Sequence, residues 1–160
     1  MAITAGKQAG AIAGVPVTGV YNQMAPFKKL SLTDDTMLDS SQLSGKVLLV
    51  CFFATWCPPC VHEIPSLVAL QNSFKSKGFS VVAFSMEKKN QTGLKNLVAK
   101  YRINYPVILA DSAVLKNFEG VTGIPVSYLV NRRGEIVKRF LGLVSHDKME
   151  AEVKHLLASN

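Results

Sequence analysis

The stretch Cys51-Phe52-Phe53-Ala54-Thr55-Trp56-Cys57-Pro58-Pro59-Cys60-Val61-His62-Glu63 decides the fold of this 160-residue chain. It begins inside an apolar run, 47–54, whose unbroken hydrophobicity predicts a central strand covered on both faces. The residues that follow predict a helix from 57 to about 77, since proline is tolerated in a first helical turn. Two cysteines therefore lie where a central strand gives way to a helix.

This placement gives the two cysteines different roles. The first backbone N–H groups of the helix point at the Cys57 sulfur, and the positive end of the helix dipole favours its thiolate form. A thiolate attacks disulfides, whereas a thiol does not. Cys60 lies about one turn further along, so the two sulfurs can join in a disulfide with Cys60 deeper. We expect Cys57 to attack and Cys60 to resolve, with this redox-active disulfide in place of any cofactor.

Other uses of a close cysteine pair fit the sequence less well. A zinc site needs two further ligands, and His62, His146 and His155 show no ligand spacing, so no metal site is predicted. A purely structural disulfide across two residues would close almost no loop. A Cu(I)-binding chaperone module stays open as an alternative, with Met86 or His62 completing the site.

Three residues around the pair need separate interpretation. Glu63 lies three residues after Cys60. It is either a partly buried acid with a raised pKa, able to exchange a proton with Cys60, or an ordinary exposed glutamate, and its position leaves both open. Cys51 is predicted to be a buried, inert thiol because free cysteine behaves as a small hydrophobe, with a third redox sulfur as the alternative. His62 is expected to be exposed.

The rest of the chain alternates strands and helices. Residues 1–24 contain several glycines and a proline, which predict a flexible arm without regular structure, and residues 25–160 form one domain. The expected strands are 27–32, 36–38, 47–54, 79–85, 106–109, 126–130 and 136–141, and the expected helices are 57–77, 91–101, 112–118 and 145–157. This order predicts an α/β fold with a mixed sheet, parallel at first and antiparallel at its final hairpin.

Composition and charge exclude several classes of protein. An apolar fraction of 48% and a charged fraction of 18% are typical of a globular chain, and no apolar run approaches the ~20 residues that cross a bilayer. The net charge of +7 is scattered, without the interleaved aromatics of a single-strand binder, so no nucleic-acid partner is expected. Three cysteines are too few for a disulfide scaffold. Residues 1–20 do not form a signal peptide, so we expect any signal or anchor to be absent from this sequence.

Four segments together resemble the thioredoxin superfamily, and more closely the extracytoplasmic TlpA/ResA/DsbE-like thiol–disulfide oxidoreductases. They are 46–60, Glu63-Ile64-Pro65, 78–83 and 120–136, and with the N-terminal hairpin the resemblance covers about residues 25–157. It implies a thioredoxin-like fold: a mixed central sheet flanked by helices, an N-terminal β-hairpin, and a strand–helix insertion within 88–118.

The resemblance also implies a docking site around the cysteine pair. Pro125 should follow a cis peptide bond that places the Ile124 backbone beside Cys57, where it pairs with an extended partner chain. Trp56 should cover the sulfurs. The implied substrate-binding residues are Trp56, Pro58, Pro59, Ile124 and Pro125. Glu63 matches the active-site glutamate of these proteins, which favours a catalytic role.

Two residues depart from the family pattern. Cys51 occupies a strand position where relatives usually carry asparagine, which leaves Glu63 as the main acid beneath Cys60. Ile124 stands where relatives often carry threonine or alanine, and a bulky apolar residue there should change which partners dock.

The implied activity is thiol–disulfide exchange with protein substrates. Members usually act as reductants in an oxidising compartment, often for cytochrome c maturation or similar assembly, and are re-reduced by a membrane electron donor of thiol–disulfide type. We therefore expect an extracytoplasmic monomer, periplasmic or anchored facing outside. A thiol peroxidase of the peroxiredoxin class is the alternative, but peroxiredoxins place threonine and proline ahead of a single attacking cysteine, where this chain has Thr55 and a CxxC motif.

Overall fold

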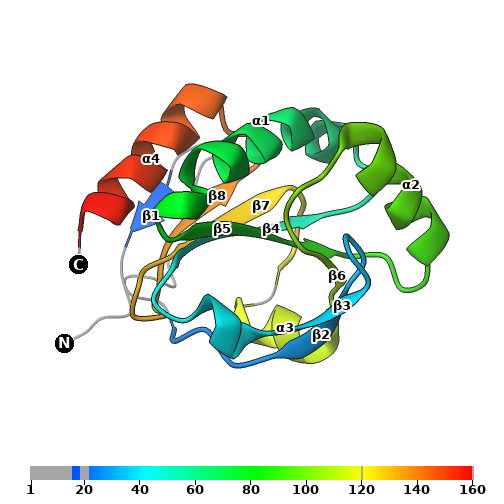
Figure 1. Cartoon of the computed structure of the whole chain (residues 1–160), viewed down its shortest axis with the longest axis horizontal. Helices are drawn as coiled ribbons and strands as arrows, with labels where there is room; N and C mark the ends of the chain where they lie inside the picture. The colour runs from blue at the N-terminus through cyan, green and yellow to red at the C-terminus, as the bar shows by residue number, and fades with distance from the viewer. Residues whose placement is uncertain (1–15, 19–21, 120, 160) are drawn as a thin grey trace.

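Figure 1 shows the computed structural model of the chain, which describes residues 16–18, 22–119 and 121–159. Its six-stranded sheet has the order β1-β8-β7-β4-β5-β6. The strands are β1 (Pro16–Thr18), β4 (Val47–Phe53), β5 (Phe79–Ser85), β6 (Val107–Leu109), β7 (Val126–Val130) and β8 (Ile136–Leu141). β4 pairs parallel with β5 and antiparallel with β7. The predicted mixed sheet is therefore confirmed, with β4 as a central strand.

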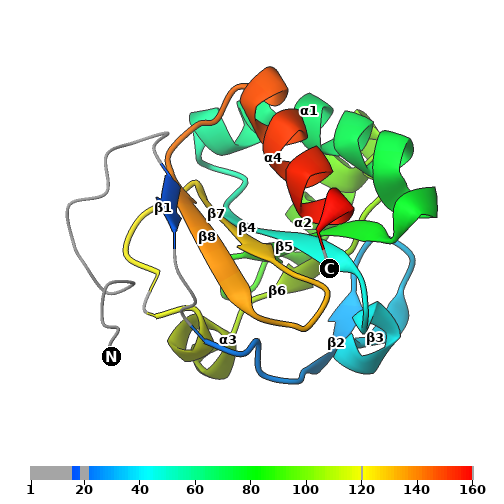
Figure 2. The same cartoon turned by 90° about the vertical axis from the view of Figure 1, so that its left-hand side faces the viewer.

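Helices cover both faces of this sheet. They are α1 (Pro58–Phe74), α2 (Gln91–Tyr101), α3 (Ser112–Asn117) and α4 (His146–Ala158). α1, α2 and α4 pack on one face, while α3 and the hairpin of β2 (Lys28–Ser31) and β3 (Thr36–Asp39) pack on the other (Figures 1 and 2). Short 3-10 helices at Ser40–Leu43 and Lys75–Lys77 complete the elements. The N-terminal hairpin and the strand–helix insertion expected from the resemblance are both present.

The alternation of side chains along β4 explains why its whole run is apolar. Val47, Leu49, Cys51 and Phe53 belong to the core under α1, and the three residues between them belong to the core over α3. All seven are buried. A strand with helices on both faces has no solvent side, so polar residues are excluded from it. Cys51 consequently points to the same side of the sheet as α1.

α1 begins and ends close to the predicted positions. Cys57 is its N-cap, Pro58 and Pro59 open the helix, and Pro65 lies inside it. The chain then turns into β5 at Gly78, whose φ of 84° is the left-handed conformation that glycine adopts without strain. The predicted stop at this glycine is confirmed.

The expectation of no regular structure before residue 25 is wrong at β1. Strand β1 pairs antiparallel with β8, with Pro16 opposite Phe140 (Figure 2). Edge pairing uses backbone N–H and C=O groups alone, so a glycine-rich segment without hydrophobic alternation gives no signal for it. The remainder of the predicted flexible arm, residues 1–15 and 19–21, lies outside the described residues.

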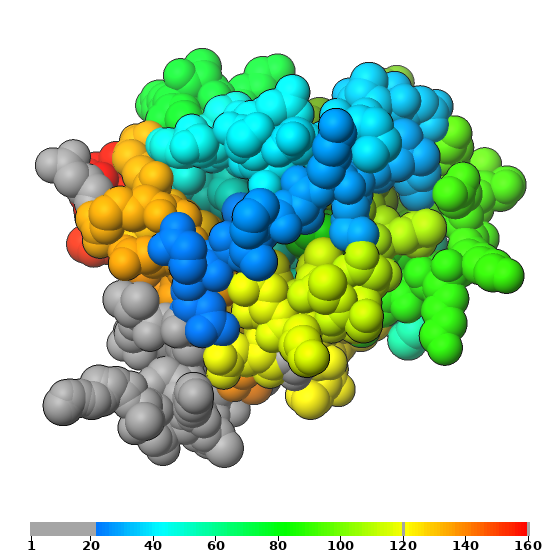
Figure 3. All heavy atoms as spheres, turned by 90° about the horizontal axis from the view of Figure 1, so that it is seen from below, coloured from blue at the N-terminus to red at the C-terminus, as the bar shows by residue number. Residues whose placement is uncertain are grey.

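The chain from Asn22 onward is held to the domain. The N–H of Met24 donates to the Gly134 carbonyl at 2.8 Å, and the Asn22 amide donates to the Asn117 carbonyl at 3.1 Å. This segment crosses the lower face beside α3 before entering β2 (Figure 3). Of the helices in the described ranges, none combines the length and the apolar character needed to cross a membrane.

Candidate active site

The cysteine pair lies at the carboxyl end of β4, on a tight turn. The N–H of Cys57 donates to the Ala54 carbonyl at 3.2 Å, which closes a turn with Thr55 and Trp56 at its centre. Cys57 and Cys60 are joined in a disulfide, with their Cα atoms 5.3 Å apart. The predicted meeting of the two sulfurs at the start of the helix is confirmed.

The two sulfurs differ in their surroundings. Pro58 and Pro59 have no N–H, so the first donor of α1 is the N–H of Cys60, and it points at the Cys57 sulfur at 3.4 Å. Cys57 is 6% exposed and Cys60 is 2% exposed. Cys57 is therefore the sulfur nearer to solvent and at the positive end of the helix, as the sequence predicts.

Glu63 is buried under the pair, which decides between the two interpretations left open by its position. It is 7% exposed, and its Oε2 accepts a hydrogen bond from the Val144 N–H at 3.0 Å. Burial raises the pKa of Glu63 from 4.5 to about 7, although the Val144 hydrogen bond opposes the rise. A carboxyl group with this pKa both accepts and releases a proton near neutral pH.

A small cavity beside Cys60 brings distant segments together. Cys51, Cys60, Glu63, Tyr105 and Pro125 line it, and its volume of about 10 Å³ is about the least that holds one water molecule. The cavity therefore links the strand, the helix and the proline loop of the site.

The proline loop and the tryptophan give the site its outer residues. The peptide bond between Ile124 and Pro125 is cis, which confirms the expectation from the resemblance. Ile124 is partly buried against both halves of the core. Trp56, the residue before Cys57, is 69% exposed, which is unusual for so large a side chain. Its ring therefore leaves an apolar surface exposed to solvent.

Cys51 is buried, as predicted. It is 3% exposed, and the Ser127 hydroxyl donates to its sulfur at 3.7 Å. Burial raises the pKa of this thiol strongly, and the nearby charge of Glu63 raises it further. Cys51 thus stays protonated at neutral pH, which disfavours attack by its sulfur.

Sequence reasoning missed Glu87 and Tyr105. Tyr105 lines the cavity, and Glu87, 9% exposed, accepts hydrogen bonds from Thr55 in the active-site turn. A signal for Glu87 was available, since it follows the end of β5, and parallel neighbours such as β4 and β5 end at one edge of a sheet.

His62 is exposed, as expected. Within the described ranges, no three Cys, His, Asp or Glu side chains form a group that could hold a metal.

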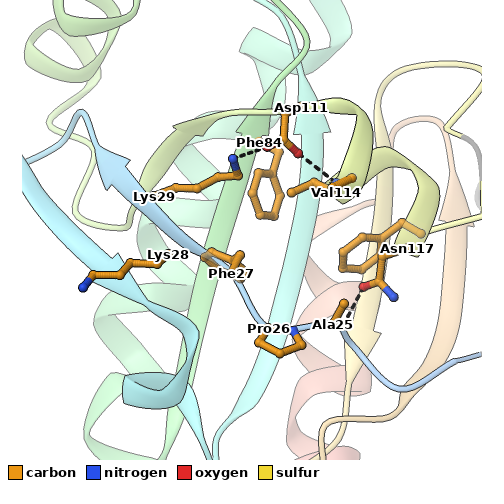
Figure 4. Close-up of a pocket in the computed structure, with 11 residues that line it drawn as sticks. Ala25, Pro26, Phe27, Lys28, Lys29, Phe84, Asp111, Val114 and Asn117 are labelled. Carbon is orange, nitrogen blue, oxygen red and sulfur yellow. Dashed lines mark hydrogen bonds and ion pairs between the residues drawn. The ribbon is translucent and has the colours of Figure 1, made fainter.

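A second hollow of about 210 Å³ lies on the opposite face, between α3 and the segment that enters β2 (Figure 4). Lys29 pairs with Asp111, whose other oxygen accepts from the Val114 N–H at 2.9 Å. The Asn117 side chain accepts from the Ala25 N–H at 2.8 Å. No cysteine is among the residues that line this hollow, and it shares no lining residue with the cavity beside Cys60.

Comparisons with known proteins agree with this geometry. The family model described as Redoxin matches residues 19–157. Thiol-disulfide oxidoreductase ResA of Bacillus subtilis (strain 168) is 32% identical in an alignment 130 positions long, which covers 78% of this chain and 72% of that protein. The crystal structure of a thioredoxin-family thiol:disulfide interchange protein from Chlorobium tepidum TLS is 32% identical with a TM-score of 0.80, covering 86% of this chain and 97% of its own. That of a candidate DsbE from Chlorobium tepidum is 25% identical with a TM-score of 0.76, covering 88% and 99%.

Proposed function

Because this chain belongs to the Redoxin family, and to the ResA type of thiol–disulfide oxidoreductase within it, we propose that it reduces disulfides in protein substrates through Cys57 and Cys60. The observation that carries this proposal is the Cys57–Cys60 disulfide at the start of α1, with the Cys60 N–H directed at the outer sulfur. A dithiol at that position holds two electrons and presents one sulfur first.

The reaction begins with the reduced pair. The Cys57 thiolate attacks one sulfur of the substrate disulfide, forms a mixed disulfide, and releases the other substrate sulfur as a thiolate that takes up a proton. The Cys60 thiolate then attacks the Cys57 sulfur, forms the Cys57–Cys60 disulfide, and releases the second substrate thiolate. The substrate gains two electrons, and the enzyme loses two.

Glu63 supplies the proton transfer that the second step needs. Cys60 is almost fully buried and must lose its proton before it attacks. Glu63 lines the same small cavity as Cys60, and its pKa of about 7 suits a carboxylate that takes up this proton. The same group returns the proton when the pair is reduced again.

Substrates dock on the residues around the outer sulfur. Trp56, Pro58, Pro59, Ile124 and Pro125 form the binding surface in this proposal. The exposure of Trp56 supports it, because a large apolar ring left in water gains free energy when a partner covers it. The Ile124 backbone pairs with an extended partner segment, and its bulky side chain selects among partners.

The relatives named ResA and DsbE support a proposal about the compartment in which the protein acts. We propose that the protein acts as a monomer in an extracytoplasmic compartment, periplasmic or anchored facing outside, in cytochrome c maturation or related assembly. A membrane donor of thiol–disulfide type re-reduces the Cys57–Cys60 disulfide, and no other cofactor takes part. A Cys57–Cys60 reduction potential more negative than that of the compartment is expected, and a more positive one would make the protein an oxidant.

The cysteine variants test the mechanism. Cys57→Ser should abolish insulin reduction, whereas Cys60→Ser should accumulate mixed disulfides that are visible on non-reducing gels. Cys51→Ser serves as the matched control that also removes one thiol. Undiminished insulin reduction by Cys57→Ser would refute the proposal. Rapid peroxide consumption by the wild-type protein would favour a peroxidase instead.

A further inference from the structure

The carboxylate of Glu87 joins three segments at the rim of the active site. It accepts hydrogen bonds from the Thr55 N–H at 3.1 Å and from the Thr55 hydroxyl. It also accepts from the Ser85 hydroxyl at 2.8 Å and from the Asn90 amide at 2.9 Å. These donors belong to the active-site turn, the end of β5 and the N-cap of α2.

Burying a carboxylate without hydrogen-bond partners costs much free energy, so a buried carboxylate needs donors around it. Four donors meet this one, and charge-assisted hydrogen bonds are the strong and directional ones. Burial raises the pKa of Glu87, but the hydrogen bonds from Thr55, Asn90 and Ser85 outweigh it, so the pKa stays below its ordinary value. Glu87 is therefore a fixed anionic anchor at neutral pH.

Glu87 contacts the turn that leads into Cys57. Thr55 and Trp56 are the central residues of the turn that the Cys57 N–H closes onto Ala54. Glu87 holds both the backbone and the side chain of Thr55. The Trp56 ring, 69% exposed, has no aromatic or cation–π partner among the contacts found in the described residues. Its direction therefore depends on the turn beneath it.

We propose that Glu87 is a positioning residue that fixes the Thr55–Trp56 turn, so that Trp56 and Cys57 meet a protein substrate in one arrangement. This inference rests on the proposed roles of Trp56 and Cys57. Asn90 caps α2 and also donates to Glu87, so the start of α2 is linked to the same turn. The anchor orders the docking surface before a partner arrives, which lowers the entropy lost on binding.

The test uses Glu87→Gln, which keeps the shape and removes the charge, and Thr55→Val, which removes the hydroxyl at the other end. Each variant should raise KM for insulin about tenfold, since the docking surface is no longer ordered before the partner arrives. Turnover of the small disulfide cystamine, which needs little docking surface, should change less than twofold. Trp56 is the only tryptophan in the sequence, so its fluorescence anisotropy reports the turn directly and should fall in both variants.

The control is Glu135→Gln, which removes a hydrogen-bonded carboxylate on the hairpin between β7 and β8 and should leave both readouts unchanged. The double variant should show no more than the larger single effect, because both changes weaken the same interaction between Thr55 and Glu87. Additive effects, or an unchanged KM and anisotropy in folded Glu87→Gln, would overturn the inference. If Glu87→Gln does not fold, Thr55→Val decides by the same readouts. A wild-type protein inactive on every disulfide would refute the proposed function instead, and the anisotropy would still decide the role of Glu87.

Discussion

The Oε2 atom of Glu63 accepts a hydrogen bond from the backbone N–H of Val144 at 3.0 Å, although 81 residues separate them in sequence. Glu63 comes from α1, and Val144 comes from the loop between β8 and α4. Glu63 is thus carried by α1 and hydrogen-bonded to the loop before α4, and it lines the cavity that Cys60 also lines. A glutamine at position 63 would keep this contact and lose only the ability to ionise.

Glu63→Gln should change how stability depends on pH. The folded protein keeps the Glu63 proton up to about pH 7, whereas the unfolded chain loses it near 4.5, so the folded state binds more protons between these values. The free energy of unfolding of the wild type therefore falls as pH rises through this window, by up to about 3 kcal/mol from this group. Denaturant unfolding of both oxidised proteins between pH 4.5 and 8 measures the difference.

The free energy of unfolding of the variant, relative to that of the wild type, should rise across that window and become constant near pH 8, where Glu63 is ionised in both states. Glu135→Gln removes a carboxylate whose pKa is lowered by hydrogen bonds from Asn131 and Arg133, so it should keep the wild-type slope above pH 4.5. Parallel curves for the wild type and Glu63→Gln would show that Glu63 ionises normally in the folded protein.

The same substitution should slow resolution of the mixed disulfide. Without a base in the cavity, Cys60 has no buried acceptor for its proton, and general-base assistance is worth about 100-fold or more. In the wild type, the rate of the second step should rise with pH around 7, and Glu63→Gln should lack this inflection. Rapid mixing of reduced protein with a fluorescent disulfide peptide measures it, and an unaltered pH profile would remove Glu63 from the mechanism.

Cys51 should prove chemically silent. Its buried, protonated thiol predicts that iodoacetamide leaves Cys51 unlabelled in the reduced folded protein and labels it only after unfolding. Mass spectrometry counts the labels. Cys51→Ala should keep insulin reduction within twofold and destabilise the fold by about 1 kcal/mol, since the Ser127 hydroxyl loses its acceptor. Loss of activity in a folded Cys51→Ala protein would instead support a third redox sulfur.

Trp56→Ala should weaken docking of protein substrates. Removal of the exposed ring takes away apolar contact area next to Cys57, so KM for insulin should rise about tenfold while cystamine reduction is kept. Met37→Ala is the matched control, because Met37 is an exposed apolar residue, 52% accessible, on β3. Equal effects of the two substitutions would mean that Trp56 has no special part in binding.

Much of the fold was readable from the sequence because its signals are local. The bounds of β5, α2, β7 and β8 follow from hydrophobic runs, glycine stops and turn residues, and the structure reproduces them. The pair at the start of α1 follows in the same way from a strand, two prolines and an amphipathic helix. β1 escaped prediction because its only signal is backbone pairing with a strand more than 100 residues away.

The sequence by itself determined which sulfur caps the helix and which lies one turn deeper, because N-cap position and helical spacing are properties of consecutive residues. Only the tertiary structure decided that Glu63 is buried, and that Glu87 reaches across from β5 to hold Thr55. Burial and hydrogen bonding between distant segments depend on how the layers pack. These set the protonation of Glu63 and anchor the turn, and a one-dimensional pattern does not contain them.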